Sequence, residues 1–168
     1  MSLREWVFEQ LAMYAAHHRD GRNRATHHVG VPLIVFALLV GFDQLKIISI
    51  GPADVTVAQV LLSALMALYL LTIPLIGVMA CLFYAALYAV VLRVPADMIW
   101  PVAVGGFVLG WIIQFVGHAF EGRRPALFVN LTQVFMAPAF LLAEMLFAAG
   151  VGRKLAGELG LRTGKYAE

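Results

Sequence analysis

The longest apolar stretch of the chain runs from Val55 to Leu92 and contains no charged side chain. As one helix its 38 residues would be about 57 Å long, nearly twice the hydrocarbon thickness of a bilayer. Pro74 lies near its middle, and proline lacks a backbone N–H and clashes with the preceding helical turn. We therefore expect two antiparallel helices that meet at Pro74.

Three further apolar segments have the length of a helix and are separated by polar or turn-forming residues. They run from Asn23 or Thr26 to about Phe42, from Trp100 to Phe120, and from Ala126 to Ala149. With the two helices about Pro74 they predict an all-α, polytopic membrane helical bundle with about five membrane helices. Pro138 stands inside the last segment, and the pattern leaves open whether it folds that helix back.

The two ends of the chain are more polar than the segments between them. From Ser2 to Arg19, apolar residues recur at helical spacing among charged ones. This pattern predicts an amphipathic helix that lies on the membrane surface or caps the bundle. We expect a single membrane helical domain over residues 1–150 and a polar C-terminal tail over residues 151–168.

Composition supports a membrane protein. The mean hydropathy is +0.86 and 13% of the residues are charged, which is too little polar side chain to cover a water-soluble protein. Membrane lipid is therefore an expected partner. A formal net charge of +2 is too small to indicate nucleic-acid binding. The single cysteine, Cys81, excludes a disulfide framework and a cysteine-based zinc site.

Arginines mark one end of the predicted bundle. Arg19, Arg22 and Arg24 precede the first membrane helix, and basic residues favour the cytoplasmic side. If the chain turns at Pro74, the helix that carries His118 returns to this side. The last helix would then take the polar tail to the opposite side unless it folds back.

Five histidines stand as two adjacent pairs and one distant residue, namely His17-His18, His27-His28 and His118. Adjacent residues of a helix point about 100° apart, so we expect one member of each pair to be a metal ligand. His18 shares a helix face with Tyr14, and His27 shares one with Asn23. His118 has Glu121 three places on, at a spacing that lets both face a common centre.

Two or three imidazoles with a carboxylate form a ligand set that suits Fe(II) and oxygen chemistry, and zinc also fits it. Asn130 and Gln133 face one side of the last segment, where they either orient imidazoles or bridge helices. The arginines are candidates for lipid headgroup anchors or for substrate binding. Gly105, Gly106 and Gly110 predict a surface of close helix packing.

Two sequence blocks together resemble a known family. The first contains Tyr14, His18, Arg19, Asn23, Arg24, His27, Gly30 and Pro32. The second contains Trp111, Gln114, Phe115, Gly117, His118, Glu121, Pro125, Ala126, Leu127, Asn130, Leu131 and Gln133. They are similar to those of the small membrane proteins typified by the fungal 2-hydroxy-fatty-acid dioxygenase of the endoplasmic reticulum, over most of the chain from about Leu3 to Phe147.

The resemblance implies an Fe(II)-dependent enzyme of fatty-acid α-oxidation. Such an enzyme uses O2 to shorten a long-chain 2-hydroxy fatty acid by one carbon, without 2-oxoglutarate. The resemblance assigns metal binding and catalysis to His18, His27, His118 and Glu121. Roles in orienting the ligands or in binding substrate go to Tyr14, Asn23, Arg24, Arg123, Asn130 and Gln133. His17 and His28 fit the pattern less closely, and the role of Glu144 is open.

An integral membrane location follows, in the cytoplasmic membrane of a bacterium or the endoplasmic reticulum of a eukaryote, with the metal site near the cytoplasmic face. Two alternatives are a haem-binding membrane protein, which would use a histidine pair from two helices, and a non-catalytic membrane scaffold. A di-iron desaturase or hydroxylase would need more than five histidines.

Overall fold

The structure is a computed structural model that describes residues 1–122 and 132–166. Its helices are α1 (Leu3–Ala16), α2 (Gly21–Phe42), α3 (Val57–Thr72), α4 (Pro74–Val91), η1 (Ala96–Met98), α5 (Ile99–Glu121), α6 (Gln133–Ala148), α7 (Arg153–Thr163) and η3 (Gly164–Tyr166). The predicted all-α class is confirmed, with one small addition. The segment expected to be a loop after α2 forms an antiparallel hairpin of β1 (Lys46–Ile50) and β2 (Ala53–Thr56).

Three helices are long and apolar enough to cross a membrane: Gly21–Phe42, Pro74–Val91 and Ala96–Glu121. The expectation of about five membrane helices is therefore too high for the described residues. Helices α3 and α6 have 16 residues each, or about 24 Å, which is shorter than a hydrocarbon core of about 30 Å. Strand β2 includes Val55 and Thr56, which the apolar pattern had assigned to the first helix of the long run, and α3 begins only at Val57.

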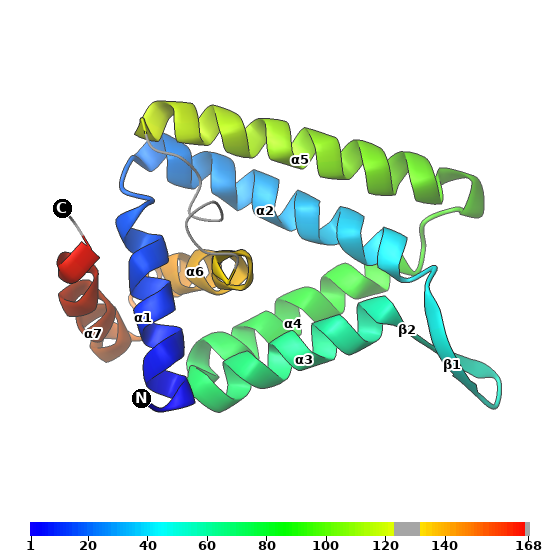
Figure 1. The fold of residues 1–168 in the computed structure, drawn as a ribbon, viewed down its shortest axis with the longest axis horizontal. Helices are drawn as coiled ribbons and strands as arrows, with labels where there is room; N and C mark the ends of the chain where they lie inside the picture. Colours follow the sequence, from blue (N-terminus) through cyan, green and yellow to red (C-terminus); the bar gives the residue numbers. More distant parts are fainter. Residues whose placement is uncertain (123–131, 167–168) are drawn as a thin grey trace.

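The expected break at Pro74 is confirmed. Helix α3 ends at Thr72, and Pro74 is the first residue of α4, where its missing N–H costs no helical hydrogen bond. The two helices lie side by side as a hairpin (Figure 1). A Cβ atom on Gly77 would lie 2.6 Å from the backbone nitrogen of Leu70, so this glycine permits the close approach of the chain after the turn.

Helices α2 and α5 form a second closely packed pair along their whole length (Figure 1). Their contact depends on glycine. A Cβ atom on Gly110 would lie 2.5 Å from Cγ1 of Ile34, and one on Gly106 would lie 3.2 Å from Cβ of Ala37. The predicted close-packing surface is thus confirmed for these two glycines. It does not include Gly105, where an added Cβ atom would meet nothing within 4 Å.

Helix α6 differs most from the expected arrangement. It begins at Gln133 and continues through Pro138 without a break, so this proline does not fold the helix back. In Figure 1 α6 is seen nearly end-on while α2 and α5 are seen lengthwise, so α6 runs across the bundle. Nine of its 16 residues are buried, in contact mainly with α1 and α4. The polar segment that follows therefore stays at the end of the bundle where α1 lies (Figure 1).

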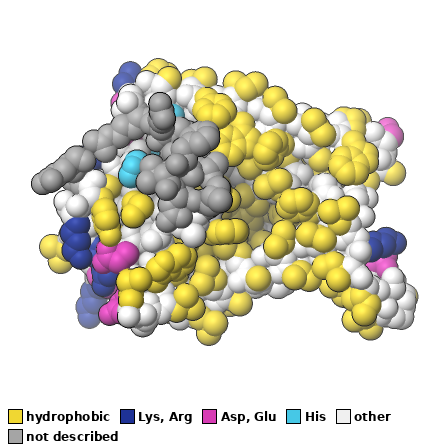
Figure 2. Space-filling model, in the orientation of Figure 1, with side chains coloured by type: hydrophobic (Ala, Val, Ile, Leu, Met, Phe, Trp, Pro, Cys, Tyr) yellow, Lys and Arg dark blue, Asp and Glu magenta, His cyan; other side chains and the backbone are white. Residues whose placement is uncertain are grey.

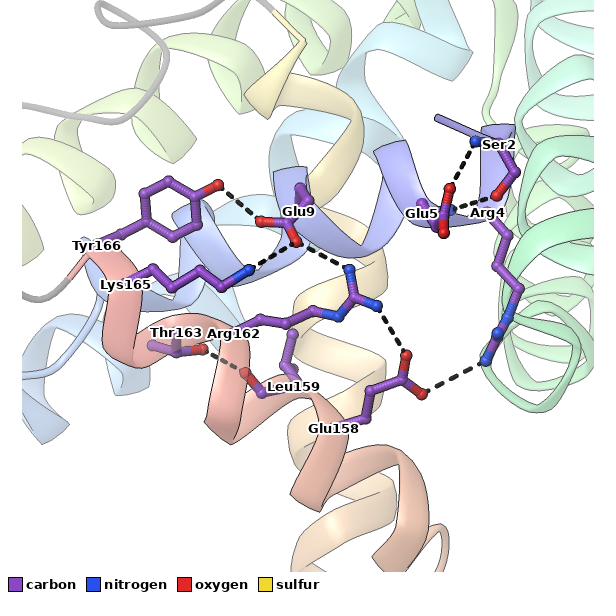
Figure 3. A network of polar contacts seen from close by, with 10 residues as sticks. All are labelled: Ser2, Arg4, Glu5, Glu9, Glu158, Leu159, Arg162, Thr163, Lys165 and Tyr166. Atoms are coloured by element: carbon purple, nitrogen blue, oxygen red, sulfur yellow. Dashed lines mark hydrogen bonds and ion pairs between the residues drawn. The ribbon is translucent and has the colours of Figure 1, made fainter.

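Helix α1 caps this end of the bundle and is held by α7. Its Val7, Phe8 and Leu11 are almost completely buried. On its outer side, Figure 3 shows Glu9 accepting hydrogen bonds from Arg162 at 2.8 Å and from the Tyr166 hydroxyl at 2.7 Å. The segment expected to be a polar tail thus contains a helix that packs on α1.

The outer surface is apolar between two polar ends. Figure 2 shows hydrophobic side chains over the middle of the visible face, with charged side chains near the ends. The exposed apolar residues of α4 and α5 include Val78, Leu82, Trp100, Val108 and Ile112. This distribution matches a band covered by lipid, with α1, α6 and α7 at one end and the β-hairpin at the other.

Candidate metal centre

Three histidines from three elements meet inside the end of the bundle that α1 caps. His18 lies in the turn between α1 and α2, His27 in the second turn of α2, and His118 in the last turn of α5. Their side chains are buried, with residue exposures of 3%, 3% and 6%. One ring nitrogen from each lies within 4.8 Å of the others, an arrangement that could hold a metal ion.

Hydrogen bonds to backbone carbonyls fix the tautomers of two of these rings. Nδ1 of His18 donates to the carbonyl of Tyr14 at 2.7 Å, and Nδ1 of His27 donates to the carbonyl of Asn23 at 2.8 Å. A carbonyl oxygen only accepts, so each Nδ1 carries the proton and each Nε2 of a neutral ring has a free lone pair. These two Nε2 atoms lie 3.1 Å apart. A cation between them would remove the repulsion of the two lone pairs.

Burial keeps His18 uncharged. Removal from water, together with the neighbouring His27, lowers the pKa of His18 to about 3. His18 is therefore neutral at physiological pH, the form that coordinates a metal. Nδ1 of His118 is buried and has no hydrogen-bond partner among the described residues. These donor atoms fit a metal ion that prefers imidazole, such as iron or zinc.

Glu121 connects the end of α5 to the turn that carries His18. Its carboxylate accepts hydrogen bonds from the backbone N–H groups of Arg19 and Asp20, both at 2.9 Å, and from Nδ2 of Asn23 at 3.0 Å. The group of three histidines does not include it. In this geometry Glu121 holds Asn23, whose carbonyl orients His27.

Close packing and stacking complete the support of the histidines. The Tyr14 ring stacks on His18 with centroids 4.0 Å apart and planes 11° apart. A Cβ atom on Gly117 would lie 2.0 Å from Oγ1 of Thr26 and 2.6 Å from Oδ1 of Asn23. Glycine at this position therefore lets α5 approach α2 closely enough for His118 to join the other two rings.

The other histidines lie outside this group. Nδ1 of His17 contacts the carbonyl of Met13 at 2.9 Å. Nε2 of His28 lies 3.3 Å from the Glu144 carboxylate, which also pairs with Arg24 at 2.8 Å. Arg24 is thus engaged in an ion pair away from the three rings. Two further candidates, Arg123 and Asn130, lie outside the described residues.

A cavity of about 100 Å³ adjoins the histidines between α2, α5 and α6. Most of its lining is apolar, and the apolar residues are Val31, Ile34, Val35, Leu38, Trp111, Val134, Ala137 and Pro138. Its polar lining consists of Tyr14, the three histidines, Gln114 and Gln133. Gln133 was a sequence candidate, whereas Gln114 was not given a role. The signal for Gln114 was its place one turn before His118 in an otherwise apolar helix.

Two comparisons with known proteins identify the same family. The chain matches the family model described as 2-hydroxy-palmitic acid dioxygenase Mpo1-like over residues 5–149. It is 37% identical over 153 residues to the 2-hydroxy-palmitic acid dioxygenase MPO1 of Saccharomyces cerevisiae, in a match that covers 89% of this chain and 85% of the yeast protein. No solved structure matches it. The resemblance seen in the two sequence blocks is confirmed, and the chain belongs to the Mpo1-like family.

Proposed function

We propose that this protein is an Fe(II)-dependent dioxygenase that shortens a long-chain 2-hydroxy fatty acid by one carbon, without 2-oxoglutarate. The observation that carries the proposal is the group of three buried histidines beside an apolar cavity. The name of the yeast relative supports the substrate class, because that protein acts on 2-hydroxy-palmitic acid.

In this proposal His18, His27 and His118 hold the metal. Bound Fe(II) would supply activation of O2 and a centre that the hydroxyl and carboxylate oxygens of the substrate can chelate. The carbonyls of Tyr14 and Asn23 keep Nε2 of His18 and His27 deprotonated and directed at each other. Glu121 fixes Asn23 and the turn before α2, so the ligands remain in place when substrate enters.

The cavity suits the two chemically different ends of a fatty acid. The three clustered histidines and two glutamines are among its polar lining residues, and side chains such as Val31, Val35 and Trp111 form the apolar lining. The carboxylate and hydroxyl would lie at the histidines while the first carbons of the acyl chain fill the apolar part. The apolar walls also limit access of water to the reacting carbons.

The location is part of the same proposal. Three helices are membrane-span candidates, so we propose an integral membrane enzyme of the cytoplasmic membrane in a bacterium or the endoplasmic reticulum in a eukaryote. Arg19, Arg22 and Arg24 stand at the histidine end, which favours the cytoplasmic side for the metal site.

Two measurements test the function. Anaerobically purified protein should contain about one iron per chain, and in air it should convert 2-hydroxypalmitate to the acid one carbon shorter, detected by mass spectrometry. Added 2-oxoglutarate should leave the rate unchanged, because the substrate itself provides two chelating oxygens. Iron-loaded protein that leaves 2-hydroxypalmitate intact would refute the proposal. A Soret band would instead select the haem-binding alternative.

A further inference from the structure

Two glutamines whose side-chain oxygens have no hydrogen-bond partner among the described residues line the cavity beside the histidines. Gln114 belongs to α5 and Gln133 is the first residue of α6, and both line the cavity. Their exposures are 5% and 1%. Oε1 of each is buried without a hydrogen-bond partner among the described residues. Buried amide oxygens without partners are uncommon, so the cavity is expected to receive a hydrogen-bond donor.

The packing around Gln114 keeps its amide in this position. A Cβ atom on Gly30 of α2 would lie 3.1 Å from Cδ and 3.3 Å from Cγ of Gln114, so glycine at that position makes room for the side chain. Gln114 also stands four residues before His118 and shares its helix face. Its side chain and the His118 ring therefore lie on the same side of α5, and both line the cavity.

Gln133 is held differently. Its Nε2 donates a hydrogen bond to Oε1 of Gln10 at 2.8 Å. Gln10 of α1 therefore holds the side-chain amide of Gln133 in place. Oε1 of Gln133 is the second acceptor without a partner on a glutamine that lines the cavity, among the described residues.

The 2-hydroxyl is the one group of the proposed substrate that can donate a hydrogen bond to such an acceptor. Ionised carboxylate oxygens only accept hydrogen bonds, and the acyl chain has no polar hydrogen, whereas a 2-hydroxyl can donate one. An unsubstituted fatty acid has no such donor.

We propose that Oε1 of Gln114 accepts a hydrogen bond from the 2-hydroxyl of the substrate, which makes Gln114 a specificity-determining residue that distinguishes 2-hydroxy acids from unsubstituted acids. One hydroxyl carries one proton, so one acceptor takes it directly. Gln114 takes it because it shares a helix face with His118, beside which the hydroxyl would lie. This inference rests on the proposed function for the identity of the ligand.

Binding, measured apart from turnover, tests the inference. Iron-loaded protein in detergent is equilibrated under anaerobic conditions with 2-hydroxypalmitate or palmitate, and the ratio of the two dissociation constants is determined. The wild type should prefer the hydroxy acid. Gln114→Met has a side chain of similar length without an acceptor, and it should reduce this preference about tenfold while bound iron stays unchanged. Gln114→Asn has a side chain shorter by one carbon, which moves the acceptor oxygen away from the substrate, so it should also reduce the preference for the hydroxy acid.

Gln44→Met is the matched control. Gln44 lies at the opposite end of α2, where its Nε2 donates to the carbonyl of Val40 at 3.3 Å, so its replacement should leave the preference unchanged. An unchanged preference in the folded Gln114 variants would overturn the inference. A larger loss of preference in Gln133→Met than in Gln114→Met would also overturn it, because the hydroxyl would then belong to Gln133.

Turnover of the wild type separates this inference from the proposed function. If the wild type converts 2-hydroxypalmitate but Gln114→Met keeps the full binding preference, the inference alone fails. If the wild type converts nothing, yet binds the hydroxy acid preferentially and loses this in Gln114→Met, the proposed reaction fails while the role of Gln114 stands.

Discussion

Nε2 of His18 and Nε2 of His27 lie 3.1 Å apart although neither ring has a proton to place between them, because each Nδ1 proton is used by a backbone carbonyl. With His118 this pair of acceptors forms a group that could hold a metal ion. The third ring, His118, comes from a helix that starts at the opposite end of the bundle (Figure 1). The site therefore depends on the packing of α5 against α2.

Replacement of His118 by alanine should abolish stoichiometric iron binding, because only two imidazoles would remain in the group. Metal analysis of the purified variant measures this, with circular dichroism as a check on helix content. His28→Ala is the control, since His28 contacts Glu144 on the outer side and should keep its iron. Retention of one iron per chain in His118→Ala would contradict the assignment.

Gly117→Ala should destabilise the protein and weaken metal binding. The added methyl group would lie 2.0 Å from Oγ1 of Thr26, so α5 must move away from α2 and take His118 with it. Overpacking of this kind typically costs about 1–3 kcal/mol. Gly105→Ala is the matched control, because it meets nothing within 4 Å and should be neutral or slightly stabilising through its helix propensity. Thermal unfolding in detergent compares the two, and equal midpoints would refute the packing argument.

Glu121→Gln tests whether this residue acts on the ligands or on the metal itself. The amide keeps one acceptor oxygen and turns an NH2 group toward the N–H donors of Arg19 or Asp20, which should cost about 1–3 kcal/mol. Since Glu121 orients His27 through Asn23, we expect iron affinity to fall about 10- to 100-fold with full occupancy at high iron.

Iron titration and thermal unfolding of this variant separate the two roles. Glu158→Gln is its control, since Glu158 pairs with Arg4 and Arg162 at the contact of α1 and α7 and contacts none of the three histidines, so iron affinity should stay unchanged. A variant with unchanged stability that does not bind iron at any concentration would identify Glu121 as a direct ligand.

The sequence predicted those parts of the site that depend on local geometry. The spacing of four residues from Tyr14 to His18 and from Asn23 to His27 became the two carbonyl contacts that orient the rings. The long apolar run required a break, which Pro74 provides. The first result follows from helix geometry and the second from bilayer thickness. Both can be evaluated from a single segment of the sequence.

Features that depend on contacts between distant segments were not predictable in this way. An apolar helix such as α6 has the same composition whether lipid or protein surrounds it, so its course across the bundle could not be derived from hydropathy. The docking of α7 depends on Glu9, more than 150 residues away from Arg162 and Tyr166 in sequence. The cavity that Gln114 lines is formed partly by Val134, Ala137 and Pro138 of α6, which are distant from it in sequence.

The contact between α1 and α7 should depend on pH. A hydrogen bond from Tyr166, followed by the charges of Lys165 and Arg162, lowers the pKa of Glu9 below its usual value of 4.5. A carboxylate whose pKa is lower in the folded state contributes stability above the unfolded value, and this contribution is lost as pH falls through the folded value. Docking should therefore be constant above about pH 5 and weaken below the ordinary carboxylate range.

Hydrogen exchange of α7, corrected for the intrinsic pH dependence of exchange, measures this effect (Figure 3). In Glu9→Gln the protection of α7 should be lower at neutral pH and should change less on acidification. Protection that falls equally in both proteins would assign the pH dependence to other carboxylates.

Ala137→Phe should shift the chain length that the enzyme accepts. Ala137 of α6 lines the cavity opposite α2, and a phenyl group there would occupy much of a volume of about 100 Å³. The polar part near the histidines would remain open, while the apolar part could no longer hold the acyl chain. We expect KM for 2-hydroxypalmitate to rise about tenfold, equivalent to about 1.4 kcal/mol, while KM for a short 2-hydroxy acid rises much less.

Ala86→Phe is the matched control for Ala137→Phe, since Ala86 lies on the exposed surface of α4 and its replacement should change neither KM. Kinetic assays with both acids decide the question. An equal rise of KM for long and short substrates in Ala137→Phe would show that the substituent disturbs the metal site and leaves the acyl chain without an assigned path, whereas a selective rise would place the chain between α2, α5 and α6.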